Sequence, residues 1–407
     1  MSRLDALYTP KQIDILKDTS KRDWFMLINH GAKRTGKTIL NNDLFLDELI
    51  RVRQIADKEG VETPQYILAG ATLGTISKNV LVELTNKYGI EFEFDKYNSF
   101  TLFGVKVVQV GHSKVSGIAA IRGMTSYGAY INEASLAHEE VFDEIKSRCS
   151  GYGARILVDT NPDHPEHWLL KDYIQNDDPK AGILSYQFKL DDNTFLNKRY
   201  KESIKASTPT GMFYERNING EWVSGDGVVY ADFDLQLNTI TKDEMVNIPI
   251  KKYFAGVDWG FEHFGSIVLL GEAINGKVYL IEEYAYQHKF IDEWVDIAKM
   301  LIGKYGNINF YCDTARPEYL TEFRRHKIRA INADKAKLSG VEEVAKLFKR
   351  RELVVVYEAM NRFKQEIFKY VWNETTGEPI KEFDDVLDSL RYAIYTHFKP
   401  TRLKKGA

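Results

Sequence analysis

The segment from His30 to Asn42, HGAKRTGKTILNN, has the residue types and the spacing of a phosphate-binding loop. Four residues separate Gly31 from Gly36, and Lys37 and Thr38 follow directly. Glycines let backbone amides wrap phosphate oxygens, a lysine reaches the outer phosphates, and the next hydroxyl binds Mg²⁺. The sequence therefore predicts a site for ATP with Mg²⁺ between a strand that enters this loop and a helix that leaves it.

A nucleotide-hydrolysing site of this type also needs acidic groups at the end of a neighbouring strand. The run SYGAYINEAS ends an apolar stretch with Asn132 and Glu133, so Glu133 is the candidate general base. Asn132 stands where aspartate is usual; its carbonyl oxygen can hold a metal-bound water, but without charge. One strand later, RILVDTNP presents Thr160 and Asn161, which can sense the γ-phosphate and relay its loss.

Three further features near the loop have more than one interpretation. The loop carries two more basic residues, Lys33 and Arg34. Arg34 can stabilise the charge that develops on the γ-phosphate, rest against Glu133 in the empty site, or face solvent. Gln12 can read an adenine edge or be an ordinary surface residue. The run DHPEHW at 163–168 matches no standard metal-ligand spacing, so loop packing is expected there.

A second group of candidate residues is acidic and lies in the C-terminal half. Asp258 ends the apolar run FAGVDWGF, and Asp313 follows NFYC in the same way. The run FDDVLDSLRY places three more carboxylates on one helix, and helical spacing gives Asp384, Asp385 and Asp388 a common face. Clustered like charges are costly unless cations neutralise them. We therefore expect Asp258, Asp313 and Asp388, with Asp385 as a further candidate, to bind two Mg²⁺ or Mn²⁺ ions. Two such metals can clamp the attacking and leaving oxygens of a phosphodiester. The alternative is that each is an ordinary strand-end or helix-cap residue.

The elements that must position the first group alternate between short apolar strands and amphipathic stretches. A helix is predicted over 37–59. Strands are predicted at 23–31, 65–71, 105–111, 128–134 and 154–162. This alternation is typical of a mostly parallel sheet covered on both faces.

The elements around the second group follow a different order. Three strands come in quick succession at 253–260, 265–273 and 277–286, with Asn275-Gly276 as a hairpin turn. Helices and strands then alternate up to a last helix at 384–398. Antiparallel strands followed by such an alternation indicate an RNase H-like sheet.

The fold class expected is therefore α/β, with an N-terminal P-loop ATPase domain followed by an RNase H-like nuclease domain. The polar and aromatic stretch at 190–234 marks the change of pattern. We place the ATPase domain at 1–205, a junction at 206–235 and the nuclease domain at 236–407.

Composition limits the remaining function classes. A chain of 407 residues is too long for one ordinary core. Its net charge of −3 excludes a whole-protein basic field, so nucleic-acid contacts must come from local patches. The candidates are Lys252, Arg316, Arg391 and the tail KPTRLKKGA, and the alternative is a solvated charged surface. Two distant cysteines favour neither a disulfide framework nor zinc, and neither a signal core nor an apolar run of membrane-spanning length occurs. These features favour an intracellular, reducing setting.

The order of the motifs resembles that of the large terminase subunit of tailed bacteriophages. GAKRTGKT, INEA, DTNP, GVDWG, YCDTARPEY and DDVLDSLRY occur in the family's order, and the resemblance extends from about Tyr8 to Phe398. The most similar subgroup comes from phages and prophages of Gram-positive bacteria. The resemblance implies an ATPase that moves double-stranded DNA into a procapsid and a nuclease that cuts concatemers.

The resemblance also implies roles for individual residues. In the nucleotide site, it assigns the loop lysine to Lys37, the Mg²⁺-binding hydroxyl to Thr38 and the arginine finger to Arg34. It assigns the catalytic glutamate to Glu133, the coupling motif to Thr160–Pro162 and the adenine contact to Gln12. The nuclease triad that it implies is Asp258, Asp313 and Asp388. Some relatives have histidine where Asp385 stands.

The partners that the family implies are double-stranded DNA, a small terminase subunit and the portal protein of the procapsid, with an oligomeric ring on the portal and no membrane. The place implied is the host bacterial cytoplasm, transiently on the procapsid and not in the mature virion.

Two other functions remain open at this point. One is a helicase-nuclease of DNA repair or recombination, although the chain shows no second helicase-type motor domain. The other is a non-catalytic, nucleotide-switched assembly factor, which the uncharged Asn132 keeps open. The sequence does not decide between cohesive-end and headful cutting.

Overall fold

The computed structural model describes residues 3–399 and divides the chain into two compact units. The first unit holds the chain up to Lys205 together with Tyr214–Val223, and the second holds Ala206–Phe213 and the chain from Ser224. The chain therefore passes between the units three times within the predicted junction. The boundaries of the motor, junction and nuclease domains stay a prediction.

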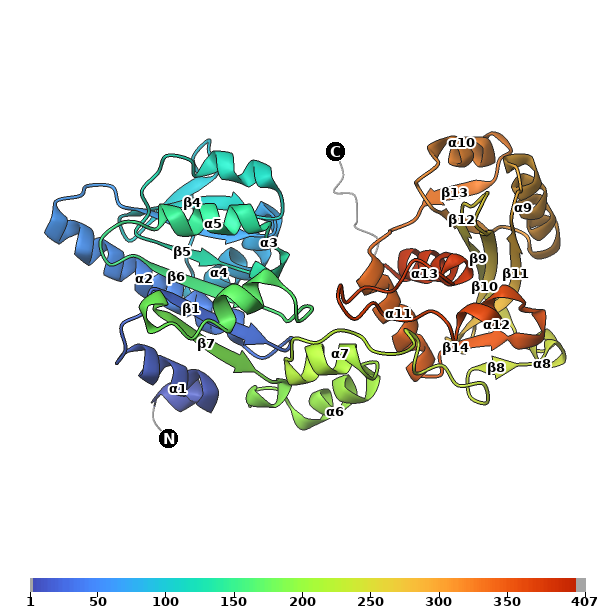
Figure 1. Ribbon diagram of the computed structural model, residues 1–407, viewed down its shortest axis with the longest axis horizontal. Coiled ribbons are helices and arrows are strands. Elements are labelled where there is room, and N and C mark those ends of the chain that lie inside the picture. Colours follow the sequence, from blue (N-terminus) through green and yellow to red (C-terminus); the bar gives the residue numbers. More distant parts are fainter. Residues whose placement is uncertain (1–2, 400–407) are drawn as a thin grey trace. The chain divides into compact units, whose positions relative to one another are not determined.

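The N-terminal unit is built on a seven-stranded sheet with helices on both faces (Figure 1). Its strands are β1 (Met26–Gly31), β2 (Gln65–Gly70), β3 (Ser99–Leu102), β4 (Val105–Gly111), β5 (Gly128–Ile131), β6 (Arg155–Thr160) and β7 (Ile183–Phe188). The strand order is β3-β4-β2-β5-β6-β1-β7, and every neighbouring pair is parallel except β3 with β4. The predicted mostly parallel sheet is confirmed.

Five helices of the N-terminal unit pack on the sheet through two apolar cores: α1 (Pro10–Thr19), α2 (Lys37–Glu59), α3 (Leu73–Ile76), α4 (Val82–Tyr88) and α5 (Glu139–Arg148). Helices α6 (Lys198–Ser207) and α7 (Met212–Tyr214) follow in the segment where the chain passes between the units. The short turns are η1 (Arg3–Ala6), η2 (Ser77–Leu81), η3 (Val115–Ala120), η4 (Ala134–Leu136), η5 (Leu169–Ile174), η6 (Pro179–Ala181), η7 (Leu190–Asp192) and η8 (Glu215–Asn219). Leu40 and Leu49 of α2 pack on one face of the sheet, and Phe142 and Ile145 of α5 pack on the other. Helix α2 has the predicted bounds because its buried leucines recur at helical spacing.

The sheet order explains why the first group of candidate residues meets. Strands β5, β6 and β1 are consecutive neighbours and run parallel. Their carboxyl ends therefore lie at one edge of the sheet, where open α/β sheets bind ligands. Gly31, Asn132 and Thr160 stand at or directly after these three ends.

The C-terminal unit is a second mixed sheet. Its strands are β8 (Thr239–Ile240), β9 (Ile250–Asp258), β10 (Gly265–Ala273), β11 (Val278–Tyr286), β12 (Asn309–Cys312), β13 (Arg329–Asn332) and β14 (Leu353–Val356). Its helices are α8 (Lys242–Val246), α9 (Ile291–Tyr305), α10 (Pro317–Arg325), α11 (Lys337–Lys349), η9 (Tyr357–Ala359), α12 (Arg362–Glu366) and α13 (Asp385–Phe398).

Strands β9, β10 and β11 form the predicted antiparallel meander, within the order β13-β12-β9-β10-β11-β14-β8. The outer strands run parallel to their inner neighbours. Gly276 has a left-handed φ of 83° in the β10–β11 turn, as the Asn-Gly hairpin signal predicts. The RNase H-like class is confirmed.

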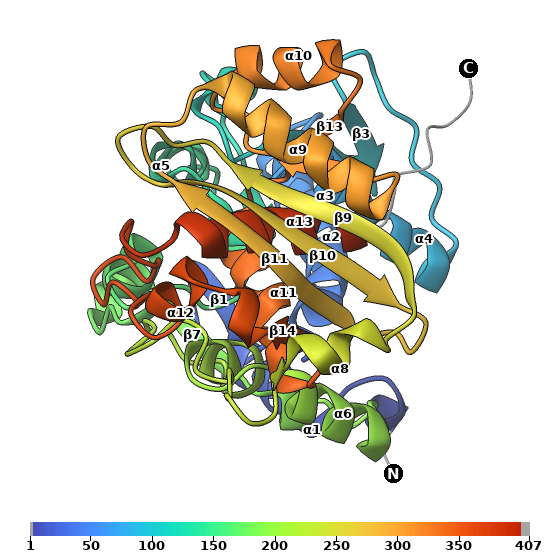
Figure 2. The same cartoon turned by 90° about the vertical axis from the view of Figure 1, so that its right-hand side faces the viewer.

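Helix α13 lies unusually close to the sheet. A Cβ added at Gly256 of β9 would lie 1.8 Å from the carbonyl oxygen of Ser389, so only glycine permits this approach. Helices α9 and α10 cover the opposite face through Trp294 and Phe323. Figure 2 shows α9 in front of the meander and α13 behind it. The close contact brings the first turn of α13 to the carboxyl end of β9, where Asp258 stands.

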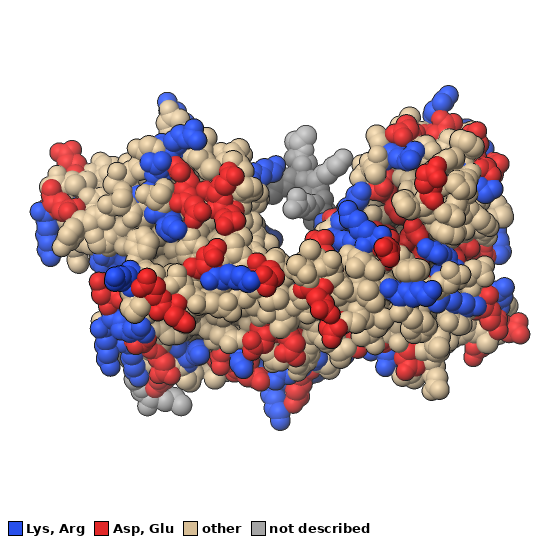
Figure 3. Space-filling view, viewed as in Figure 1, with Lys and Arg blue, Asp and Glu red and all other residues tan. Residues whose placement is uncertain are grey.

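The surface shows no single-sign face in the direction that Figure 3 displays, where acidic and basic side chains alternate on each unit. This agrees with the nearly balanced composition. Within residues 3–399, no helix combines the length and the apolar character that a membrane crossing requires.

Candidate active sites

The predicted phosphate-binding loop connects β1 to α2. Gly31 has φ 131°, and a Cβ there would lie 2.1 Å from the carbonyl oxygen of Phe188. Gly36 has a left-handed φ of 91° directly before α2 begins at Lys37. The free amides and the positive end of the α2 dipole therefore face the loop, which favours an anion there.

The Lys37 side chain is buried inside this loop. Its Nζ donates to the carbonyl oxygens of Gly31 (2.9 Å) and Ala32 (2.6 Å). It also lies 3.3 Å from Thr35 Oγ1 and 3.3 Å from Asn161 Oδ1. All four partners are neutral, so an anionic ligand would supply the counter-charge that this ammonium lacks in its contacts.

Burial lowers the pKa of Lys37 to about 8, and the negative charge of Asp159 opposes that effect. The ammonium form therefore still dominates at neutral pH, as phosphate binding requires.

Glu133, the candidate base, lines a cavity that the phosphate-binding loop also lines. Its backbone has a left-handed φ of 57°. Such a conformation is costly for a residue with a side chain and is often retained at functional sites. Burial raises the pKa of Glu133, and the charge of Asp159 adds to the effect. A carboxylate of raised basicity suits proton abstraction from water.

Asn132 is fully buried, and its amide atoms are both occupied. Its Nδ2 donates to Asp159 Oδ1 (2.8 Å), and its Oδ1 accepts from Asn79 Nδ2 (3.0 Å). The carbonyl oxygen that the sequence suggested for a metal-bound water is thus engaged with Asn79.

Thr160 and Asn161 connect the end of β6 to both sides of the cavity, which they line. Thr160 Oγ1 accepts from the backbone N–H of Ser135 (2.9 Å) and donates to the carbonyl oxygen of Asn161 (3.1 Å). Asn161 Oδ1 lies within reach of Lys37, as described above. The pair therefore links the phosphate loop to the segment that follows Glu133.

The structure does not bring Gln12 among the residues that line the cavity. Its Nε2 donates to the carbonyl oxygen of Gly36 (2.9 Å), and its Oε1 accepts from the backbone N–H of Thr9 (2.8 Å). The side chain is 3 % exposed, so it braces the phosphate loop against α1. The adenine contact stays a prediction.

Arg34 is exposed and lines the cavity, with a left-handed φ of 61°. Its carbonyl oxygen accepts from Asn193 Nδ2 (2.7 Å), which fixes the backbone there. Within the described range, no ion pair joins Arg34 to Glu133. The guanidinium is therefore positioned at the cavity without the resting contact that one interpretation expected.

The cavity has a volume of about 460 Å³ and includes residues that the sequence motifs did not single out: Lys78, Asn79, Glu83 and Asp159. Lys78 and Asn79 lie in η2, a π-helical turn, and such turns are frequent at functional sites. No sequence pattern marked this turn. Asp159 directly precedes Thr160, so the strand-end motif RILVDTNP already contains this carboxylate.

Within the run DHPEHW, His167 and Asp163 make local contacts, whereas the buried Nδ1 of His164 has no hydrogen-bond partner within residues 3–399. His167 Nε2 lies 3.2 Å from the carbonyl oxygen of Ser135, and its Nδ1 accepts from the backbone N–H of Leu169 (3.1 Å). Asp163 pairs with Arg216 (3.2 Å). These contacts leave no imidazole nitrogen of His167 for a metal.

The C-terminal carboxylates face a second cavity of about 730 Å³. Four of them line it: Asp258, Asp384, Asp385 and Asp388. Asp313 is buried behind the lining and reaches the cavity through Lys335, which does line it. The close packing of α13 on β9 is what brings residues from these distant segments together.

Most of these carboxylates are paired with basic side chains. The pairs are Asp313 with Lys335 (2.6 Å), Asp388 with Arg391 (3.0 Å) and Asp385 with Arg362 (2.9 Å). Asp258 differs, because no hydrogen bond or ion pair of its carboxylate occurs among residues 3–399.

The charges of this cluster act on one another. Burial raises the pKa of Asp258 well above its ordinary range, and the charges of Asp388 and Asp313 raise it further. Burial and the charge of Asp388 raise the pKa of Asp384 to about 6. The cluster is therefore short of positive charge.

The carboxylates share a region but do not meet at one point. In the described part of the chain, no three His, Cys, Asp or Glu side chains stand close enough together to hold a metal ion. Carboxylates without a cation between them repel, and here three of them, Asp313, Asp385 and Asp388, pair with basic side chains instead. Their oxygens are nevertheless the donors that Mg²⁺ and Mn²⁺ prefer, so the residue set fits such ions once the ion pairs open.

The other predicted phosphate contacts separate into different environments. Arg391 is 2 % exposed and bound to Asp388, while Lys252 and Arg316 are exposed. Arg316 lies over the ring of Tyr319 (5.2 Å). The tail from residue 400 onward lies outside the described residues.

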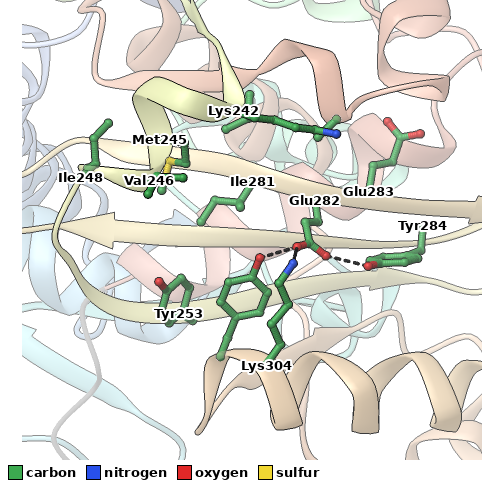
Figure 4. A pocket seen from close by; sticks show the side chains of 13 residues that line it. Lys242, Met245, Val246, Ile248, Tyr253, Ile281, Glu282, Glu283, Tyr284 and Lys304 are labelled. Carbon is green, nitrogen blue, oxygen red and sulfur yellow. Dashed lines mark hydrogen bonds and ion pairs between the residues drawn. The ribbon is translucent and has the colours of Figure 1, made fainter.

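A third cavity of the C-terminal unit, of about 620 Å³, is lined by residues of α8, β11 and α9 among others (Figure 4). Glu282 is its polar centre and accepts from Tyr284 (2.6 Å), Lys304 and Tyr305. Because these three donors satisfy the carboxylate, the cavity offers no unpaired acid of the kind found at Asp258.

Fold and geometry together define a class. One unit places a phosphate-binding loop, a candidate base and a polar relay at the carboxyl edge of a parallel sheet. The other places carboxylates around a cavity of an RNase H-like sheet. The class is thus a P-loop ATPase fold followed by an RNase H-like nuclease fold.

Comparison with known proteins identifies the family. The sequence profile described as "Terminase large subunit, T4likevirus-type, N-terminal" matches residues 31–237, which is half of the chain. The chain therefore belongs to the terminase large subunit family. None of the curated proteins matches its sequence.

Solved structures extend the similarity to both units. The large terminase of a thermophilic bacteriophage is 25% identical, with a TM-score of 0.81, over 96% of this chain and 98% of the phage protein's chain. The same phage protein in complex with ATP-γ-S matches with a TM-score of 0.79 at 24% identity, over 96% of this chain and 99% of that one. The family and this full-length match support a DNA-packaging role with ATPase and nuclease parts.

Proposed function

We propose that this chain is the motor and nuclease of viral DNA packaging, which moves double-stranded DNA into procapsids with ATP and cuts concatemeric DNA. Family membership and the match to the thermophilic phage large terminase along both units support this. The observation that carries the proposal is one chain with both a buried loop lysine whose hydrogen bonds within residues 3–399 go to neutral oxygens and a carboxylate cavity short of positive charge. We assign the motor to 1–205, the junction to 206–235 and the nuclease to 236–407.

In the motor, the loop amides and Lys37 bind the phosphates of ATP, and Thr38 holds the accompanying Mg²⁺, which neutralises phosphate charge. Glu133 takes the proton of the attacking water. Arg34, exposed at the cavity, stabilises charge on the γ-phosphate. Thr160 and Asn161 relay the loss of that phosphate, because they contact both Lys37 and the segment after Glu133.

In the nuclease, Asp258, Asp313 and Asp388 would hold two Mg²⁺ or Mn²⁺ ions, with Asp385 as a candidate fourth ligand. Such metals supply charge stabilisation for phosphodiester hydrolysis. Lys335 and Arg391 restrain two of the carboxylates, and the first turn of α13 stabilises their negative charge. Lys337 and Lys381 also line the cavity and are placed to contact DNA phosphates.

The proposal includes the partners and the place that packaging requires. They are double-stranded DNA, a small terminase subunit and the portal protein, with several copies in a ring on the portal. The protein acts in the host bacterial cytoplasm and transiently on the procapsid.

The decisive experiment separates the two activities in the full chain. The purified protein should hydrolyse ATP and cut double-stranded DNA with Mn²⁺ or Mg²⁺. Lys37→Ala should abolish only the hydrolysis, and Asp313→Ala only the cutting. If both variants kept both activities, the two-site assignment would fail.

The same preparations discriminate between the other candidate functions. A helicase-nuclease would separate the strands of a forked duplex, whereas the proposed motor moves along duplex DNA without unwinding it. A nucleotide-switched assembly factor would leave ATP unchanged even with DNA and procapsid proteins present.

A further inference from the structure

Asn132 occupies the position where P-loop ATPases usually carry an aspartate, yet a carboxylate stands beside it. Asn132 Nδ2 donates to Asp159 Oδ1 at 2.8 Å. Asp159 belongs to β6, which lies between β5 and β1 in the sheet. Its carboxylate is therefore displaced by one strand toward the phosphate loop, a distance of about 4.8 Å.

Neutral donors hold the carboxylate of Asp159 at the cavity; burial raises its pKa, and the hydrogen bond from Tyr130 and the charge of Lys37 oppose that effect. Asp159 Oδ2 accepts from Tyr130 Oη (2.7 Å), and Oδ1 accepts from the backbone N–H of Glu133 (3.1 Å) as well as from Asn132. These three donors are neutral, and no ion pair of Asp159 occurs within residues 3–399. The residue is 2 % exposed and lines the nucleotide cavity together with Lys37 and Thr38.

A carboxylate with this burial is costly unless a cation approaches it. The loop that faces it is built for a nucleotide, whose metal would bring that cation. Asn132 cannot meet this need, because it carries no charge and its carbonyl oxygen is bonded to Asn79.

We propose that Asp159 supplies the acidic group that faces the Mg²⁺ of the bound nucleotide, and that Asn132 and Asn79 are positioning residues that orient it. The inference rests on the proposed nucleotide site and extends it to a residue that the strand-end motif left unassigned. Asp159 Oδ1 already accepts two hydrogen bonds, whereas Oδ2 accepts one, from Tyr130, and retains a lone pair for a metal-bound water.

A structural role alone would predict something different. If Asp159 only joined β5 to β6 through hydrogen bonds, its replacement would lower stability equally with and without Mg²⁺. Calorimetric titration of ADP into the full chain, with Mg²⁺ and with EDTA, separates the two roles, because only an acidic group near the metal changes the Mg²⁺-dependent gain in affinity.

Four proteins give the test. We expect wild type to bind ADP more tightly with Mg²⁺. Asp159→Asn should lose about 10- to 100-fold of that gain while binding in EDTA changes little. The exchange variant Asn132→Asp with Asp159→Asn, which returns the carboxylate to its usual strand, should restore most of the gain. Lys37→Ala should lose ADP binding under both conditions.

The outcomes separate this inference from the proposed function. If wild type binds no ADP, the nucleotide site itself is wrong. If wild type gains affinity from Mg²⁺ and Asp159→Asn gains as much, the site stands and the role of Asp159 is refuted.

Should Asp159→Asn fail to fold, Asn132→Asp alone decides. It would place a second carboxylate beside Asp159, so Mg²⁺ with ADP should raise its melting temperature more than that of wild type. An equal or smaller rise would overturn the inference.

Discussion

The N-terminal cavity buries a cation among neutral oxygens, whereas the C-terminal cavity gathers carboxylates, of which Asp258 has no basic partner in the described range. The groups that hold the acidic side chains in place also differ between the two cavities. Neutral hydroxyl, amide and backbone groups hold the acidic Asp159 of the first cavity. Arginine and lysine side chains hold Asp385, Asp388 and Asp313 of the second.

This difference shows what each cavity lacks. A buried ammonium with neutral contacts is stabilised by an arriving polyphosphate. A carboxylate cluster that exceeds its basic partners is stabilised by an arriving divalent cation. The same physical cost, an uncompensated buried charge, thus selects ligands of opposite sign in the two units.

The largest expected effect is the loss of ATP hydrolysis in the N-terminal unit while nucleotide binding is kept. Glu133→Gln keeps the size and burial of the side chain but removes the proton acceptor. ATP hydrolysis should fall about 10²- to 10⁴-fold, while ADP affinity and DNA cutting stay near wild type.

Phosphate release and titration calorimetry measure the two quantities. Glu139→Gln, on the exposed start of α5, is the matched control and should change neither. Loss of ADP binding in Glu133→Gln would show that Glu133 shapes the cavity instead of acting as the base.

The second prediction uses acid to compare the units. His30 is buried, with its Nδ1 accepting from Trp222 Nε1 (3.2 Å), and burial lowers the pKa of His30 from 6.5 to about 4. Because His30 binds a proton less readily in the folded protein than in the unfolded chain, its contribution to the stability of the folded state is fully present above pH 6.5. That contribution is lost as the pH falls toward 4, by about 3 kcal/mol at most.

The carboxylate cluster should respond in the opposite direction. The raised pKa of Asp384, about 6 against an ordinary 3.8, means that its destabilising charge disappears as the pH falls through this range. Hydrogen exchange measured on peptides of β1 and β9 between pH 7 and pH 4.5 would report the two units separately.

His30→Gln keeps an acceptor for Trp222 and removes the titration, so the acid loss in β1 should shrink. His138→Gln, at an exposed position, should leave it unchanged. Equal acid responses of β1 and β9 would contradict the electrostatic contrast between the two cavities.

The third prediction is that one substitution in the C-terminal unit raises its stability and abolishes its activity. Asp258→Asn removes a carboxylate that its neighbours repel. Without metal, the unit should become more stable by roughly 1–2 kcal/mol, a value reduced for its partial exposure. DNA cutting should be lost, and stabilisation of the unit by Mn²⁺ should weaken.

Thermal unfolding with EDTA and with Mn²⁺ gives the comparison. Asp296→Asn, an exposed carboxylate on α9, serves as the control without either effect. A less stable Asp258→Asn in EDTA would mean that the carboxylate makes favourable contacts, against the charge imbalance described here.

The smallest expected effect concerns the brace at the phosphate loop. Gln12→Ala removes the hydrogen bonds to Gly36 and Thr9, which should lower the stability of the N-terminal unit by about 1 kcal/mol. Affinities for ADP and GDP should fall together by a similar factor. A selective loss for ADP would instead support the adenine contact that the sequence suggests.

Much of the fold could be read from local patterns. The glycine loop, helix α2, the meander turn at Asn275-Gly276 and the last helix all lie where the sequence predicts them, because hydrophobic period and turn residues encode them locally. Strands β3, β7 and β8 were not predicted. All three are sheet-edge strands; β8 has two residues, and β7 has only two buried residues, Leu184 and Phe188, so its alternation is weak.

The sequence by itself determined which chemistries this chain can hold, because the phosphate loop, Glu133 and the aspartates are recognisable by type and spacing within short segments. Only the tertiary structure decided how they are combined. It placed Asp159 against Asn132 across two strands, Gln12 under Gly36, and Lys335 on Asp313. Those contacts depend on strand order and on the close approach of helices to the sheets. These are set by the packing of the whole unit, and no short segment carries that information.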